Sequence, residues 1–142
     1  MTKADPELVQ LLSNVPLFAS LNPRELGSLA LAGKPHSYAA GAKVVSVGEV
    51  GVGFYLILTG RVEVHAGGKT VATLNAGNFF GEMALFHEQP RTADVVAAEP
   101  TTCLVLSSWE FWGVLSDKPE AMRELITELV KRLRATKAAL SE

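Results

Sequence analysis

A short segment in the middle of the chain has the composition of an anion-binding turn. It reads Phe80-Gly81-Glu82-Met83-Ala84-Leu85, and Arg91 follows after a brief stretch that ends in proline. Gly81 allows a sharp turn and a close ligand approach, and the residues after it favour a short helix whose first N–H groups would face an anion. Arg91 can offer paired N–H donors to phosphate oxygens. Glu82 would repel the anion, so we expect it to accept a hydrogen bond from a hydroxyl, such as a ribose 2′-OH.

Each of these residues also has an ordinary explanation when it is taken alone. A Gly-Glu pair is common, and an arginine after a proline is usually a solvated loop residue. Together, in this order and within a β-rich stretch, they favour a nucleotide pocket in which one group holds the sugar and another holds the phosphate.

The elements that must position this segment begin with a helical zone and a β zone. Residues 1–33 read as helical, with a helix start predicted at Asn22-Pro23. Residues 34–107 read as β-structure, because short strand-like runs alternate with turn residues. Gly67-Gly68 predicts a hairpin turn between two of these runs. The anion-binding segment, residues 79–95, interrupts the strand pattern.

Residues 108–142 read as helical again. Ser107 and Glu110 fit a capping box, and a longer helix is predicted to begin near Pro119. The apolar stripe of that helix consists of Met122, Ile126, Leu129, Leu133 and Leu140. This stripe could pack on the chain's own β-structure or on a second copy of the chain.

The composition argues against several classes of protein. The chain has 142 residues, a net charge of −2 and 48% hydrophobic residues, so it lacks the basic balance typical of nucleic-acid binding. It has no secretory pattern at its start and no apolar run long enough to span a bilayer. Its single cysteine, Cys103, cannot form an internal disulfide. We therefore expect a cytoplasmic protein with no nucleic-acid partner and no membrane span.

The chain resembles the cyclic nucleotide-binding domain family, which includes catabolite-activator-type regulators, kinase regulatory subunits and cyclic-nucleotide-gated channels. The family's phosphate-binding cassette reads Phe-Gly-Glu-x-Ala-Leu, a short variable stretch, then Arg-(Ser/Thr/Ala)-Ala-x-Val. This chain meets every fixed position with residues 80–85 and with Arg91-Thr92-Ala93-Asp94-Val95. The resemblance covers nearly the whole chain. One departure is Val52-Gly53, where an acidic residue is common in the family.

The resemblance implies a mainly β fold with flanking helices. The expected architecture is an eight-stranded β-roll (a jelly roll) with N-terminal helices, a short phosphate-binding helix, and C-terminal B and C helices. It also implies a single cyclic nucleotide-binding domain over residues 1–142, with N-terminal helices at 1–33, the roll at 34–107 and its cassette at 79–95, and the B and C helices at 108–142.

The resemblance assigns roles to individual residues. Gly81 and Ala84, with Ala93 as a third, would offer N–H groups to a cyclic phosphate, Glu82 would accept from the 2′-OH, and Arg91 would pair with the phosphate. Met83 belongs to the same cassette, and Thr92 would sit beside the phosphate within reach of the purine. The positions implied for the base pocket and its lid are Val64, Ala72, Leu74, Arg132 and Thr136. For the first three, ordinary core packing is an equal alternative, and Arg132 could instead be a surface arginine paired with Glu128.

The resemblance therefore implies a receptor for a cyclic mononucleotide, acting as a switch whose C-terminal helix closes over the base. Cyclic AMP is favoured over cyclic GMP, although Thr92 could bond a guanine amino group.

We expect no enzyme activity and no cofactor. We also expect no metal, because His36, His65 and His87 are scattered and do not form a set of metal ligands. The effector is unknown, and the C-terminal helix could form a homodimer. The alternatives are a degenerate docking module that binds no ligand and a β-roll metal enzyme. With no output domain before Glu142, the chain is expected to be a stand-alone receptor or a piece of a longer protein.

Overall fold

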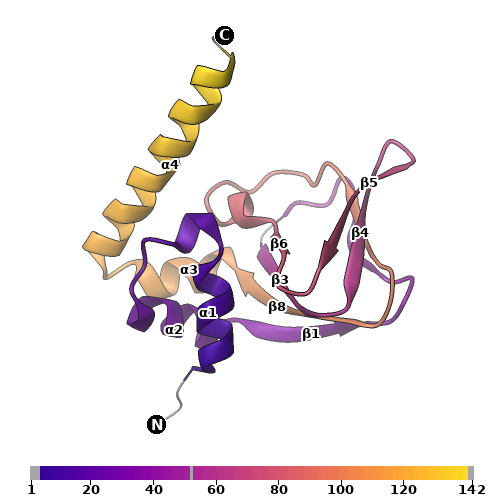
Figure 1. Cartoon of the computed structure of the whole chain (residues 1–142), viewed down its shortest axis with the longest axis horizontal. Coiled ribbons are helices and arrows are strands. Elements are labelled where there is room, and N and C mark those ends of the chain that lie inside the picture. Colours follow the sequence, from indigo (N-terminus) through magenta and orange to yellow (C-terminus); the bar gives the residue numbers. More distant parts are fainter. Residues whose placement is uncertain (1–3, 52, 141–142) are drawn as a thin grey trace. The chain divides into compact units, whose positions relative to one another are not determined.

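The computed structural model describes residues 4–51 and 53–140, which form two compact units (Figure 1). A β unit comprises Ala32–Phe111, and a helical unit comprises Met1–Leu31 together with Trp112–Glu142. That the whole chain acts as one domain stays a prediction.

The β unit consists of two four-stranded sheets in which every paired strand is antiparallel. One sheet has the order β1-β8-β3-β6, and the other has the order β2-β7-β4-β5. The eight strands of the described residues confirm the mainly β prediction. Their bounds are β1 Lys34–Tyr38, β2 Lys43–Val45, β3 Gly53–Thr59, β4 Arg61–Ala66, β5 Lys69–Asn75, β6 Phe79–Phe80, β7 Asp94–Ala97 and β8 Thr101–Ser107.

The core of the β unit takes buried side chains from both sheets. Its central cluster consists of Val45, Ile57, Val62, Val95 and Cys103. In β7, the buried Val95 and Ala97 alternate with less buried neighbours, as the two-residue period of a strand predicts, whereas β3 and β8 also bury consecutive residues. Burial raises the pKa of the Cys103 thiol to about 11, so this cysteine stays protonated at neutral pH.

The hairpin of β4 and β5 turns at Gly67-Gly68, as predicted. Both glycines have positive φ, 60° and 77°, which is the conformation that a two-residue type I′ turn requires. Val62 faces Leu74 and Val64 faces Ala72 across the pair, and the register shifts after Val64.

The helical unit contains α1 (Pro6–Ser13), the 3-10 turn η1 (Pro16–Phe18), nearly all of α2 (Pro23–Ala32) and α4 (Pro119–Leu140). The predicted helix start at Asn22 is confirmed. Asn22 Oδ1 accepts from Glu25 N at 2.8 Å, and Glu25 Oε1 accepts from Asn22 N at 2.9 Å. This reciprocal pair satisfies two N–H groups that a helix would otherwise leave unbonded.

Helix α3 (Ser108–Leu115) begins in the β unit, where Ser107 and Glu110 form the predicted capping box. Glu110 Oε1 accepts from Ser107 N at 3.0 Å, and Ser107 Oγ accepts from Glu110 N at 3.2 Å.

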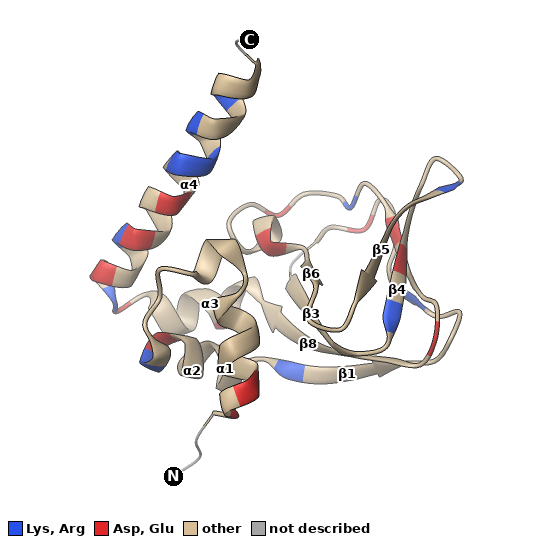
Figure 2. Ribbon diagram, in the orientation of Figure 1, with Lys and Arg blue, Asp and Glu red and all other residues tan. Residues whose placement is uncertain are grey.

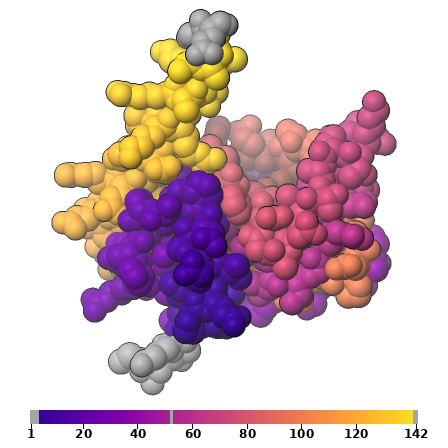
Figure 3. Space-filling model, in the orientation of Figure 1, coloured from indigo at the N-terminus to yellow at the C-terminus, as the bar shows by residue number. Residues whose placement is uncertain are grey.

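Helix α4 begins at Pro119, as predicted, but the predicted stripe does not identify its buried side chains. Ala121 and Leu125 are buried, whereas Ile126, Leu133 and Leu140 are exposed. Figure 3 shows side chains of the C-terminal half of α4 (yellow) projecting from the helix. Among the described residues, no helix combines the length and the apolar character that crossing a bilayer requires.

Candidate functional site

The site is built around a turn that only glycine fits. Gly81 follows β6 with a φ of 82° and starts the 3-10 turn η2 (Glu82–Leu85). A Cβ atom at Gly81 would lie 2.6 Å from the Gly53 carbonyl oxygen and 2.9 Å from Arg91 Nη1. Both the positive φ and the close backbone therefore exclude a side chain here. The short helix predicted after Gly81 is confirmed as this four-residue turn.

The turn is anchored on both sides by packing within the β unit. Before it, Phe80 of β6 pairs with Tyr55 of β3, and their rings stack with centroids 4.8 Å apart. Within it, Ala84 and Leu85 are buried. After it, the ring of Phe86 meets Phe111 edge-on at 5.5 Å. These contacts hold the backbone of η2 in place.

Arg91 is held in a narrow slot beside the turn. Its Nη2 donates to the Gly53 carbonyl at 2.9 Å, and its guanidinium lies over the Tyr55 ring, 5.8 Å from the centroid. A Cβ atom at Gly51 would lie 2.5 Å from Arg91 Nε, so the slot has room for the guanidinium only because residue 51 is glycine. Burial raises the pKa of Tyr55 and the charge of Arg91 opposes the rise, so the phenol beneath the guanidinium is neutral at physiological pH.

The backbone of Arg91 is fixed by hydrogen bonds to the segment before β3. Arg91 N donates to Glu49 O at 2.7 Å, and Arg91 O accepts from Gly48 N at 2.8 Å. Two residues before Arg91, the Gln89 carbonyl accepts from Gly51 N at 2.9 Å. Arg91 is therefore positioned by both its main chain and its side chain.

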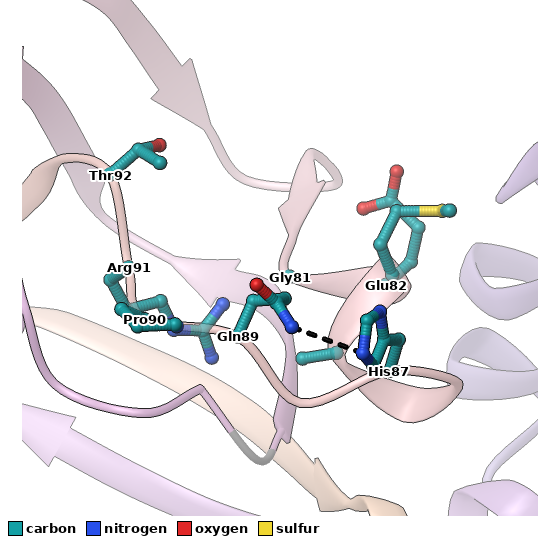
Figure 4. Close-up of a pocket in the computed structure, with 9 residues that line it drawn as sticks. Gly81, Glu82, His87, Gln89, Pro90, Arg91 and Thr92 are labelled. Atoms are coloured by element: carbon teal, nitrogen blue, oxygen red, sulfur yellow. Dashed lines mark hydrogen bonds between the residues drawn. The ribbon is translucent and has the colours of Figure 1, made fainter.

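A cavity of about 330 Å³ opens between the turn and Arg91 (Figure 4). Its size lies within the roughly 300–1,000 Å³ typical of small-molecule sites. Figure 4 shows Glu82 and Arg91 on opposite sides of Gly81, so a carboxylate and a guanidinium flank the same turn. Such an arrangement can bind a ligand that carries an anionic group and a hydroxyl.

Comparison with known proteins gives the family. The model of the cyclic nucleotide-binding domain matches residues 35–118, more than half of the chain. The chain belongs to the cyclic nucleotide-binding domain family. A cyclic nucleotide-gated potassium channel of Rhizobium etli is 41% identical over 111 residues, which are 78% of this chain and 31% of the relative. A cAMP-dependent protein kinase regulatory subunit of Schizosaccharomyces pombe is 43% identical over 114 residues, which are 80% of this chain and 28% of the relative.

A solved structure supports the fold as well. The N-terminal domain of a transcriptional regulator from Streptomyces coelicolor superposes with a TM-score of 0.85 at 27% identity, covering 91% of this chain and 96% of that domain. The two curated relatives are much longer, and this chain spans about a third of their length.

The cavity brings together six of the seven residues predicted for the phosphate and ribose. They are Gly81, Glu82, Met83, Ala84, Arg91 and Thr92. The seventh, Ala93, is half-buried and is not among the described residues that line the cavity. The Ala84 N–H donates to Gly81 O at 3.1 Å, so its predicted bond to a phosphate requires that N–H to be shared with the ligand. The ligand roles of all seven stay predictions.

Sequence reasoning missed two groups of residues around the cassette. His87, Gln89 and Pro90 line the cavity, and the Gln89 amide lies 3.0 Å from His87 Nε2. Their position could have predicted this, because they lie between Leu85 and Arg91, in the stretch that joins the two halves of the motif. The second group, which forms the slot around Arg91, carries no local signal because it lies far away in sequence: Gly51, Gly53 and Tyr55.

The residues predicted for the base pocket do not line this cavity. Val64 and Leu74 are partly buried and pack against the core cluster of the β unit. Ala72, opposite Val64 on β5, is exposed. The described contacts of Val64 and Leu74 are therefore core packing. Their contact with the base of a ligand stays a prediction.

The predicted lid residues lie on α4, in the helical unit. Arg132 is half-buried and Thr136 is exposed. Thr136 Oγ1 donates to the Arg132 carbonyl at 3.0 Å, as threonine commonly does within a helix. Their role over the base, like the closing of α4, stays a prediction.

The three histidines are dispersed over the β unit. His36 lies on β1 and His65 on β4, where His65 Nε2 is 3.2 Å from Glu63 Oε1, and His87 follows η2. Within residues 4–51 and 53–140, no three side chains of His, Cys, Asp or Glu gather as metal ligands would.

Proposed function

We propose that this chain is a receptor domain for a cyclic mononucleotide, whose cyclic phosphate binds between the turn at Gly81 and Arg91. The observation that carries the proposal is the placement of Arg91, which is held beside Gly81 by Gly53 and Tyr55 and faces the same cavity as Glu82. A guanidinium has several N–H donors, and the bond to Gly53 leaves others for phosphate oxygens. Glu82 would accept a hydrogen bond from the ribose 2′-OH, because its carboxylate repels the phosphate but can accept from a hydroxyl.

We propose cyclic AMP as the preferred ligand, with cyclic GMP as the alternative. A relative 43% identical to this chain is named a cAMP-dependent protein kinase regulatory subunit. Thr92 lies exposed at the cavity, where its hydroxyl could reach either base. Parallel calorimetric titrations with the two nucleotides test the choice, and tighter binding of cyclic GMP would reverse it.

We propose that binding works as a switch in which α4 closes over the base. Ligand binding can shift the helix only if the ligand binds the closed state more tightly than the open one. Arg132 and Thr136 are the residues on α4 that would supply this difference. Hydrogen exchange tests the idea: cyclic AMP should slow amide exchange in α4, and it should do so less in Arg132→Ala. Unchanged exchange in α4 at saturating ligand would contradict closure.

Binding rather than catalysis is the activity that we infer, with no cofactor and with an effector protein that is still unknown. The rival is a docking module of the same fold that has lost its ligand. A ligand that binds the folded state must raise its stability by mass action. A rise in melting temperature with millimolar cyclic AMP, abolished in Arg91→Ala, would support the receptor, and no rise with either nucleotide would support the docking module.

Two further properties belong to the proposal. The buried free thiol of Cys103 suits a reducing compartment, and we infer a cytoplasmic location. We also infer that the chain forms a homodimer through α4, since that helix carries exposed apolar side chains.

A further inference from the structure

A second cavity in the β unit, of about 340 Å³, is lined by residues of β1, β3, β8 and α3. A row of paired residues crosses three strands along it: Lys34 of β1 pairs with Val105 of β8, which pairs with Tyr55 of β3. Paired residues point to the same face of a sheet, so these side chains lie on one side. Trp109 of α3 also lines the cavity, which we call the Trp109 cavity. None of the described residues that line it lines the cavity at the cassette.

Two aromatic rings and an aliphatic side chain give the Trp109 cavity its apolar walls. Tyr55 and Val105 are partly buried, whereas Trp109 is 66% exposed. The capping box of α3 does not require this ring, because Ser107 and Glu110 form it. A tryptophan at a surface offers a large contact area from a side chain with few rotatable bonds, and aromatic rings pack favourably on one another. These walls therefore suit a planar aromatic ligand.

The polar side chains of the Trp109 cavity favour an anion. Lys34 and His36 are two residues apart on β1, so they point to the same face, and both are exposed. Figure 2 shows basic colouring (blue) and no acidic colouring (red) on β1. Glu110 also lines the cavity, but its Oε1 already accepts from Ser107 N and from Ser107 Oγ. Lys34 Nζ lies 3.7 Å from Glu110 Oε2 and its side chain is 74% exposed, so this ion pair is weak and the lysine is free to turn toward a ligand.

We propose that the Trp109 cavity is a second ligand site, which binds a small planar aromatic anion such as an aromatic carboxylate. The ring of the ligand packs against Trp109 and Tyr55, and its carboxylate faces Lys34 and His36. An ammonium group and an imidazole N–H both donate to carboxylate oxygens. An aromatic cation fits less well, because Lys34 repels it and the Glu110 carboxylate is already used by the capping box.

Two residues that line the Trp109 cavity also hold Arg91. The Gly53 carbonyl accepts from Arg91 Nη2 at 2.9 Å, and the Tyr55 ring lies beneath the guanidinium. A ligand packed against Gly53 and Tyr55 favours the arrangement in which they hold Arg91, so it should raise the affinity for a cyclic nucleotide. By linkage, the nucleotide should raise the affinity for the aromatic anion by the same factor. This coupling rests on the proposed function, whereas binding of the aromatic anion does not.

Equilibrium dialysis with three compounds that share one ring system tests the site and the sign of its charge. The compounds are 2-naphthoate, which is an anion, 2-naphthalenemethanol, which is neutral, and 2-naphthalenemethylamine, which is a cation. We expect 2-naphthoate to bind about fivefold more tightly than either of the others, because it alone gains from Lys34. An absence of binding at millimolar 2-naphthoate would overturn the site. Equal or tighter binding of the alcohol or the amine would overturn the preference for an anion.

Matched variants locate the bound 2-naphthoate. Trp109→Leu should weaken its binding about tenfold through loss of the ring, and an unchanged melting temperature would show that the fold persists. Lys34→Gln should weaken binding about three- to fivefold. Lys69 is an exposed lysine that begins β5, an edge strand of the other sheet, so Lys69→Gln should leave binding unchanged. If Trp109→Leu binds 2-naphthoate as the parent does, the compound lies elsewhere and the assignment fails.

The coupling is tested by calorimetric titration of cyclic AMP with and without saturating 2-naphthoate. We expect 2-naphthoate to tighten cyclic AMP binding about two- to tenfold in the parent and to have no effect in Trp109→Leu. Unchanged or weaker cyclic AMP binding in the parent would overturn the coupling. A chain that binds 2-naphthoate but neither nucleotide would refute the receptor proposal alone. A chain that binds cyclic AMP but not 2-naphthoate would refute the second site alone.

Discussion

The cassette around Arg91 and the hairpin of β4 and β5 are the two parts of the β unit that family resemblance assigns to the ligand, and they are held in place by different means. The cassette is fixed by contacts with a distant part of the chain: Arg91 bonds Gly53, lies over Tyr55 and is enclosed by Gly51. The hairpin instead turns its apolar residues Val64 and Leu74 toward the core. The proposed phosphate side is thus fixed by contacts between distant segments of the β unit, whereas the described contacts of the proposed base side serve packing.

The strongest test of this contrast is removal of the arginine. Arg91→Ala should weaken cyclic AMP binding about a hundredfold or more, because the phosphate would lose its counter-charge in a partly buried site. Calorimetry measures the loss. Arg61→Ala is the matched control, since Arg61 is an exposed arginine at the start of β4 and should leave affinity unchanged. An Arg91→Ala chain that binds like the parent would remove the basis for the phosphate site.

The turn itself should be the next most sensitive element. Gly81→Ala adds a Cβ against the Gly53 carbonyl at a φ of 82° and should cost about 2 kcal/mol or more of stability. Gly41 has a φ of 87°, and a Cβ there would have no atom within 4 Å, so Gly41→Ala reports the backbone cost alone. Urea unfolding compares the two. Equal losses would mean that the close approach to Gly53 does not constrain the turn.

The ring beneath Arg91 should contribute a smaller amount. Tyr55→Leu removes a cation–π contact of about 0.5–2 kcal/mol and should weaken cyclic AMP binding several-fold. Tyr55→Phe keeps the ring and should bind almost as the parent does. If both variants lose affinity equally, the phenol hydroxyl rather than the ring is what positions Arg91.

The hairpin should respond in stability rather than in affinity. Leu74→Ala removes a partly buried side chain that packs on the core cluster and should destabilise the fold by about 1 kcal/mol, with affinity for cyclic AMP changed less than about twofold. Thermal unfolding and calorimetry on the same sample separate the two effects. A tenfold loss of affinity would instead assign Leu74 to the base pocket.

The sequence predicted those features that depend on neighbours in the chain. The helix starts at Asn22 and Ser107, the Gly67-Gly68 hairpin and the turn after Gly81 each arise from a local rule about caps or positive φ. These rules hold wherever the segment lies in the fold, so they transfer well from sequence to structure.

What the sequence did not predict depends on distant contacts. The slot around Arg91 draws on Gly53 and Tyr55, which are 38 and 36 positions away, and no local pattern links them to a cassette arginine. On α4, helical periodicity indicated an apolar helix but could not identify which of two adjacent faces is buried. Leu125 is buried and Ile126 beside it is exposed, because the rest of the unit and not the helix decides between them.

The slot also has a consequence for how this sequence can vary. Gly81 needs to be glycine for its φ alone, but Gly51 has no positive φ, and the atoms nearest to a Cβ there all belong to Arg91. The two residues are therefore coupled. A lineage that lost the arginine would be free to place a larger residue at position 51 while position 81 stayed glycine. The residue at position 51 should therefore mark which relatives still carry the arginine.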